Sequence, residues 1–268
     1  MKNALIALGA FIRPSIATML QYRGEMALWA VWGVVYPSVA MAMWSAAVKG
    51  SEAGAIDGMD GRDFAAYFLL MMIVGHLTTA WDIFEMGHVV RTGAMSPRLL
   101  RPVLPIWHNL ADNLAYKLVT LVMLAPIWGA IAAAAQPRIT AGATQLALGA
   151  AAVVLGAILH FLWNYNLALG AFWMTRTEAL AELWWGSNIL FGGRMAPLTV
   201  MPLPLQWVAM GLPFQWIIWF PSATLAGQLD PAGIARGLVW QGAWLVLGIL
   251  FFRVAWRFAV RRYSAVGA

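Results

Sequence analysis

The sequence contains no cysteine, and only 10% of its 268 residues are charged. The absence of cysteine excludes disulfide bonds and thiolate metal sites. A soluble globular domain carries about 25% charged residues, so the shortage of charge argues against that class of protein. The hydrophobic share of 62% instead predicts an integral membrane protein.

The usual motifs of catalysis are also missing. A phosphate-binding loop of the form GxxxxGK[ST] is absent, because none of the three lysines, Lys2, Lys49 and Lys117, follows a glycine. The sequence also lacks the zinc motif HExxH and the nucleophile motif GxSxG. We therefore predict that the chain is not an enzyme, with no catalytic residue, no metal site and no ATPase site of its own.

Long apolar stretches dominate what is present. About 20 mostly apolar residues span a bilayer as a helix. Six stretches meet or approach that length: residues 26–48, 64–83, 118–135, 144–172, a stretch that begins near Leu183, and 237–258. The remainder is too small for a second domain. The predicted fold is an all-α integral membrane protein with six transmembrane helices in a single transmembrane domain, residues 1–268.

Two regions outside these spans have their own patterns. Residues 1–24 alternate apolar and basic or polar side chains, which predicts an interfacial elbow helix, interrupted near Pro14. Residues 192–227 are apolar and rich in tryptophan, but glycine and proline break them repeatedly. Non-helical backbone at membrane depth needs protein or water around it. We predict short re-entrant or interfacial helices here, with Trp207, Trp216 and Trp219 at headgroup level.

Residues 84–117 form a polar, basic segment between the second and third spans. Gly93 follows a helical run that ends with Arg91, a pattern typical of a helix C-terminus. Ser96 and Pro97 suggest an N-cap followed by proline at the first helical position. We predict a short basic helix here that carries Arg98 and Arg101.

The distribution of lysine and arginine predicts the orientation. With the N-terminus in the cytoplasm, twelve basic residues face the cytoplasm and five face the other side, so the positive-inside rule places both termini in the cytoplasm. The twelve are Lys2, Arg13, Arg23, Arg91, Arg98, Arg101, Lys117, Arg176, Arg253, Arg257, Arg261 and Arg262, and the five are Lys49, Arg62, Arg138, Arg194 and Arg236.

Several polar residues fall within or beside the apolar stretches. A charged side chain at the centre of a bilayer costs about 2.5 to 3.5 kcal/mol, so Arg194 must face protein, water or headgroups. It either extends to the outer interface or lies on a translocation pathway. Asn164 and Asn166 either bond to neighbouring helices or line that pathway. His76 and His160 either bond to neighbouring helices or ligate a haem.

Taken together, these features resemble the membrane subunits of ABC-2-type transporters, the exporter-like permeases. The resemblance rests on RTGAMSPRLLRPVLP after the second span, on GAFW near the end of the fourth, and on two stretches before the sixth, FGGRMAPLTVMPLPLQWV and LPFQWIIWFPSATLAG. It also includes the amphipathic start and the number of spans.

The resemblance implies a permease that exports an amphipathic or hydrophobic substrate, such as a drug, lipid or glycan. Its partners would be a separate ATP-binding cassette ATPase subunit, a second permease chain in a homodimer or heterodimer, and membrane lipid, with no nucleic acid. ATP and magnesium would bind to the partner subunit, and this chain would hold no cofactor. The localisation would be the bacterial cytoplasmic (inner) membrane. An ion-coupled secondary carrier and a haem-containing redox protein are the alternatives.

The resemblance also assigns roles to residues. The cytoplasmic segment 84–117 would couple the chain to the ATPase subunit, and residues 192–227 would shape the outer gate. The coupling residues would be Arg91, Gly93, Ser96, Pro97, Arg98, Leu100, Arg101 and Pro102. The candidates for the translocation pathway or outer gate are Asn164, Asn166, Asn188, Arg194, Trp216 and Trp219.

Overall fold

The computed structural model describes residues 2–174 and 176–263, and within these ranges the chain is helical with no strand. The elements in chain order are α1 (Lys2–Gln21), α2 (Arg23–Gly50), α3 (Gly61–Thr78), α4 (Asp82–Arg91), α5 (Ser96–Leu99), α6 (Ile106–Ala135), α7 (Ala143–Ala168), the 3-10 helix η1 (Leu169–Phe172), α8 (Glu178–Phe191), the 3-10 helix η2 (Leu198–Val200), α9 (Leu203–Met210), α10 (Phe214–Ile217), α11 (Trp219–Ala226) and α12 (Pro231–Arg262).

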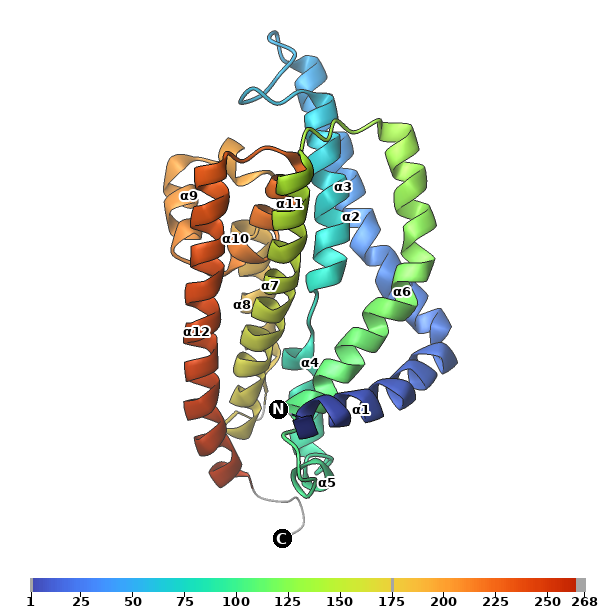
Figure 1. The fold of residues 1–268 in the computed structure, drawn as a ribbon, viewed down its shortest axis with the longest axis vertical. Helices are drawn as coiled ribbons and strands as arrows, with labels where there is room; N and C mark the ends of the chain where they lie inside the picture. The colour runs from blue at the N-terminus through green and yellow to red at the C-terminus, as the bar shows by residue number, and fades with distance from the viewer. Residues whose placement is uncertain (1, 175, 264–268) are drawn as a thin grey trace.

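Five stretches of the described chain are long and apolar enough to cross a membrane: α2, residues 61–91, α6, residues 143–172, and α12. They run along the long axis of the molecule (Figure 1). The fifth predicted span corresponds to α8, which has 14 residues. At 1.5 Å per residue it is about 21 Å long, shorter than the hydrocarbon core of about 30 Å. The count of six spans therefore stays a prediction.

The second predicted span is broken, which the sequence pattern did not indicate. Helix α3 ends at Thr78 and α4 begins at Asp82, so residues 79–81 are not helical. The third predicted span was wrong at its start: α6 begins at Ile106, not at Leu118. Polar side chains misled the prediction, because Asn109, Asn113 and Lys117 are helical and buried against other elements.

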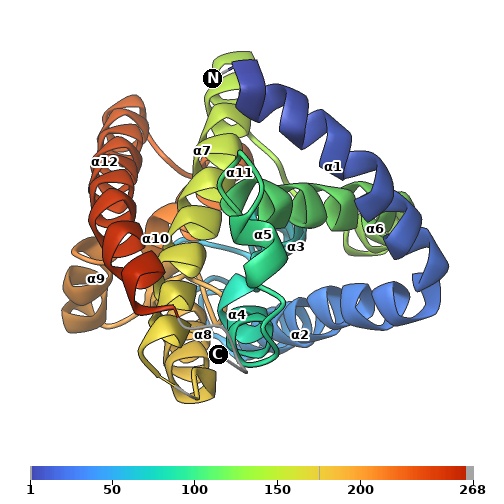
Figure 2. The ribbon, with the colours of Figure 1, turned by 90° about the horizontal axis from the view of Figure 1, so that it is seen from below.

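Helix α1 lies across one end of the bundle instead of along it (Figures 1 and 2). The predicted interruption near Pro14 was wrong, because α1 continues through that residue. The Ser15 hydroxyl bonds to the carbonyl of Phe11 at 2.9 Å and to Asp112 Oδ1 of α6 at 2.6 Å. The end of α12 lies at the same end of the bundle as α1.

A cluster of polar residues joins two connections at the opposite end. Asp60 caps α3 by accepting hydrogen bonds from the backbone N–H groups of Arg62 and Asp63, at 2.8 and 3.1 Å. The Arg138 guanidinium bonds to the Asp60 carboxylate and lies 3.4 Å from Asp63 Oδ2. Arg62 Nε donates to the carbonyl of Gln136 at 2.9 Å. This cluster ties the start of α3 to the α6–α7 connection.

The cluster predicts a small dependence of stability on pH. Slight burial acts to raise the pKa of the Asp60 carboxyl, but the backbone N–H groups and Arg138 outweigh it, so that pKa lies below its ordinary value. Its stabilisation is therefore complete above the ordinary carboxyl pKa and is lost as the pH falls through the lower, folded value. Because the pair is partly exposed, we expect less than about 1 kcal/mol.

Thermal unfolding in detergent at stepwise lower pH would measure this effect. Arg138→Gln should reduce the acid-induced fall in the midpoint temperature. An identical fall in the two proteins would contradict the assignment to this ion pair.

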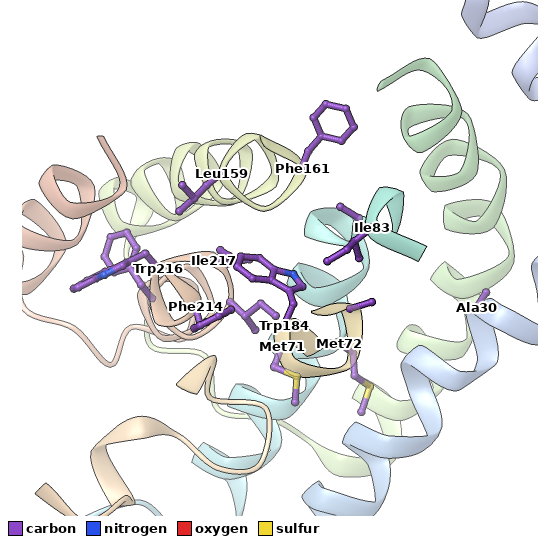
Figure 3. Packing of buried hydrophobic residues seen from close by; sticks show 14 of the residues in the cluster. Ala30, Met71, Met72, Ile83, Leu159, Phe161, Trp184, Phe214, Trp216 and Ile217 are labelled. Atoms are coloured by element: carbon purple, nitrogen blue, oxygen red, sulfur yellow. The ribbon is translucent and has the colours of Figure 1, made fainter. Parts of the chain in front are cut away.

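The buried apolar core lies where α3, α7, α8, α10 and α11 meet. Figure 3 shows Trp184 of α8 beside Phe214 of α10, and their ring centroids are 4.7 Å apart. Met71 and Met72 of α3 lie close by, and both are almost fully buried. Residues 203–226 thus return into the bundle: the chain descends from the exposed α9 to α10, and α11 leads back to the start of α12 (Figure 1).

Candidate coupling segment and polar pathway

Helix α4 and α6 are joined by residues 92–105, which we call the α4–α6 connection. The connection begins as predicted, with a glycine after the end of a helix. Gly93 has a φ of +72°, a left-handed conformation that suits glycine at this position. Ser96 was wrongly predicted as an N-cap. It is the first residue of α5, and its hydroxyl lies 2.7 Å from the Tyr263 hydroxyl. Helix α5 is therefore held from beyond the end of α12.

The three arginines of this region have different partners. Arg91 Nη2 lies 3.8 Å from Glu178 Oε1 of α8. Arg98 Nη1 donates to Asn109 Oδ1 at 3.3 Å. Arg101 stacks over the ring of Phe11 in α1, 5.4 Å from its centroid. Arg98 and Arg101 thus attach the α4–α6 connection to α6 and α1, and Arg91, the last residue of α4, lies beside α8.

Four of the predicted coupling residues are exposed on the α4–α6 connection. Leu100 is 87% exposed, the highest value among the large exposed hydrophobic side chains of the described residues. Pro97, Arg101 and Pro102 are also exposed. An apolar side chain that projects from a rim of arginine and proline is the composition expected of a protein contact.

Helix α1 reaches the same region through a second set of contacts. Asp112 of α6 accepts a hydrogen bond from Ser15, and its other oxygen lies 2.9 Å from His108 Nδ1. The ring of His108 lies 5.3 Å from that of Phe11. A movement of the α4–α6 connection would therefore be transmitted to α1.

The break at residues 79–81 lies directly above this region, and side chains from other elements satisfy its backbone. His160 Nδ1 bonds to the carbonyl of Thr78 at 2.9 Å, and Asn113 Nδ2 to the carbonyl of Thr79 at 3.0 Å. Asn164 Oδ1 accepts from the N–H of Ile83 at 3.0 Å. The first N–H groups of a helix have no partner within it, so Asn164 supplies a cap for α4 from α7.

A buried polar network continues from the break into α6. Asn109 Nδ2 donates to Asp82 Oδ1 at 2.8 Å, and Lys117 Nζ donates to Asn113 Oδ1 at 2.6 Å. His76 Nε2 lies 3.1 Å from the Thr120 hydroxyl. Sequence reasoning did not select Asp82, Asn109 or Asn113 as site residues. The sequence feature that could have identified them is the four-residue spacing of positions 109, 113 and 117. This spacing places three polar side chains on one face of a helix.

The histidines of the spans are engaged by protein groups. Besides Thr78, His160 contacts Trp184, whose Nε1 donates to His160 Nε2 at 3.4 Å. Both ring nitrogens of His160 are therefore used. This leaves neither nitrogen free to bind iron, so the geometry favours the reading of His160 as a structural residue.

The outer-gate candidates do not form a single group. Arg194 Nε donates to Asn188 Oδ1 at 2.8 Å, and the ring of Trp185 lies 5.1 Å from Arg194 Cζ. Asn164 and Asn166 do not join them: Asn164 caps α4, and Asn166 Nδ2 donates to the carbonyl of Gly248 in α12 at 2.9 Å.

Trp216 and Trp219 line a different feature, a cavity of about 240 Å³ between α9, α10, α11 and the start of α12. Gln206, Gln215 and Arg236 also line it. Trp216 is 4% exposed and stacks on Trp240, so its side chain packs inside the protein, and its place at headgroup level stays a prediction. Trp207 is 68% exposed, as a residue at an interface would be.

A family model described as ABC-2 family transporter protein matches residues 51–267. The match includes the break, the α4–α6 connection and the outer region. Neither the curated proteins nor the solved structures gave a match.

Proposed function

Because the chain belongs to the ABC-2 family of transporter proteins, we propose that it is the exporting permease of a transporter whose α4–α6 connection docks on the ATPase subunit. The family makes it a multi-pass membrane transport subunit that works with an ABC ATPase subunit. The observation that carries the docking proposal is the exposure of Leu100 at the tip of the connection.

The remaining features follow from this arrangement. Two permease chains would pair, ATP and magnesium would bind to the partner ATPase, and the end of the bundle with α1 and α5 would face the cytoplasm of a bacterial cell. The substrate would be amphipathic or hydrophobic. Helix α1 would lie in the membrane interface as the predicted elbow.

The proposed mechanism passes through the broken span. Closure of the ATPase subunits on ATP would displace α5, and the displacement would move α4 through the short Gly93 turn. Helix α4 packs against α7 and α8, and α8 leads to Arg194 and the outer region. The side-chain bonds at 79–81 allow α4 to move while α3 keeps its position, because no continuous helix joins them.

The first test is purification of the tagged chain from its native membranes in mild detergent, followed by mass spectrometry. We expect an ATPase subunit that carries a phosphate-binding loop to co-purify. A chain that is recovered alone under conditions that preserve other membrane complexes would contradict the proposal and favour an ion-coupled carrier.

A further inference from the structure

Arg194 lies deep in the bundle. Its Nη1 atom is 3.5 Å from the position that a Cβ atom would occupy on Gly75 of α3. Gly75 lies 14 residues after Gly61, where α3 begins at the outer end, which is about 21 Å along the helix axis. The hydrocarbon core is about 30 Å thick. The guanidinium is therefore at membrane depth and does not extend to the outer end of the bundle.

The surroundings hold this arginine in place. Gly193 has a φ of +79°, and a Cβ there would lie 2.6 Å from the Tyr67 hydroxyl. That hydroxyl donates to the carbonyl of Gly193 at 2.6 Å, and Trp44 Nε1 donates to the carbonyl of Met195 at 2.9 Å. The loop that carries Arg194 is thus bonded to α2 and α3 on both sides of the residue.

The charge of Arg194 is not balanced. A guanidinium has five N–H donors, and within residues 2–174 and 176–263 only Nε has an acceptor, the fully buried Asn188. No carboxylate of these residues lies within 4 Å of it. Lys117, which is buried, differs from the partly buried Arg194 because it lies in the polar network of Asp82. An unbalanced charge at membrane depth is expensive and typically functional.

The acidic side chains of this chain do not supply the missing negative charge. All eleven belong to described residues: Glu25, Glu52, Asp57, Asp60, Asp63, Asp82, Glu85, Asp112, Glu178, Glu182 and Asp230. None of them forms an ion pair with Arg194, and Asp82, at the break that follows α3, instead accepts a hydrogen bond from Asn109.

We propose that Arg194 binds the acidic headgroup of an amphiphile, a carboxylate, phosphate or sulfate, that the transporter carries. This inference rests on the proposed transport function and names its substrate class. Tyr36 and Trp185, each 41% exposed, lie beside the guanidinium and offer apolar faces to the tail of the amphiphile. Asn188 holds Nε, while Nη1 and Nη2, which lie 3.5 and 3.8 Å from the Cβ position of Gly75, have no acceptor among the described residues and could give an oxyanion two hydrogen bonds.

The test uses three probes with the same chain length: radiolabelled hexadecanoate, hexadecanol and hexadecyltrimethylammonium. Binding is measured to the full-length chain in nanodiscs of phosphatidylcholine. Hexadecanoate should bind at least tenfold more tightly than the other two. Arg194→Gln should remove that preference, and Arg194→Lys should keep part of it. Arg253→Gln, which removes an exposed arginine of α12, is the matched control and should change nothing.

Thermal unfolding guards against a folding artefact. Arg194→Gln removes an unbalanced charge but also the donor to the buried Asn188, so its midpoint temperature should stay within a few degrees of the wild type. Lost binding in a protein that unfolds normally would support the proposal. Equal binding of acid and alcohol, a preference for the cation, or unchanged binding in Arg194→Gln would overturn it.

A final arm separates a transported amphiphile from a resident lipid of the same chemistry. With the co-purified ATPase present, ATP should discharge bound hexadecanoate from the wild-type permease. Bound acid that ATP does not discharge would overturn the substrate assignment and identify a lipid site. Failure of the ATPase to co-purify would instead contradict the proposed function, since the binding measurement needs only the permease.

Discussion

Replacing Leu100 by aspartate is expected to weaken ATPase binding strongly while the helical bundle remains intact. The side chain is 87% exposed, so the substitution costs the isolated chain almost nothing. In a docked complex the same side chain would be desolvated, and truncation of such a central contact costs about 2 kcal/mol or more. A buried carboxylate adds to that cost. We expect affinity for the ATPase subunit to fall about thirtyfold or more.

Co-purification and permease-stimulated ATP hydrolysis would measure this loss. Leu203→Asp is the matched control, because Leu203 is 62% exposed on α9 at the opposite end of the bundle. Normal ATPase binding by Leu100→Asp would remove the tip of the α4–α6 connection from the docking surface.

The structure also separates the two arginines that the sequence placed together in this segment. Arg101 is exposed, and its guanidinium lies over the ring of Phe11. Arg98 bonds to Asn109 and lies near Glu85 and Asp112. Arg98→Glu would place a third carboxylate beside those of Glu85 and Asp112, and the repulsion between them would lower the stability of the fold. Arg101→Glu is therefore the informative charge reversal for docking.

Asn164→Leu is expected to reduce stability and coupling together. The change is nearly isosteric, but it leaves the buried N–H of Ile83 without its acceptor. An unsatisfied buried donor costs about 1 to 3 kcal/mol. Because Asn164 also fixes the start of α4 against α7, we expect lower ATP-driven transport at a temperature where the protein is still folded.

Asn166→Leu provides the comparison two residues away in the same helix. It removes a bond to the carbonyl of Gly248, which lies within α12 and has a helical N–H partner. The cost should therefore be near 0.6 kcal/mol, the average for hydrogen bonds between membrane helices, and coupling should be unchanged. Equal effects of the two substitutions would contradict a special role for the break. Unfolding in detergent and transport in proteoliposomes give the two readouts.

Apolar length and helix-end signals predicted much of the fold. Residues 144–172 were predicted as a span and form α7 and η1, and Gly93 has the left-handed conformation that its position predicted. The break at 79–81 was missed because no glycine or proline marks it. Its causes are distant in sequence: His160, Asn113 and Asn164 supply bonds that a local pattern does not contain.

The candidate site shows the same division. Sequence alone placed Leu100 in the coupling segment through the family resemblance, but its exposure is a tertiary property. Asn188 and Arg194 are six residues apart and form a pair that the loop geometry creates. Asn164 and Asn166 were grouped with them by polarity, yet each bonds to a different helix. The polarity of these residues within apolar stretches marked them as structurally or functionally important. Only the packing of the helices shows which partner each of them has.

The break in the second span has a mechanical consequence. Helix α4 has ten residues and is therefore about 15 Å long. It can pivot as a rigid helix about the three non-helical residues at its upper end. A tilt of about 10° would swing its lower end by about 3 Å, roughly the length of one hydrogen bond, while the fulcrum stays almost still. A small rotation of α4 at the break would therefore correspond to a larger displacement at the docking surface. The length of α4 alone sets how large that displacement is.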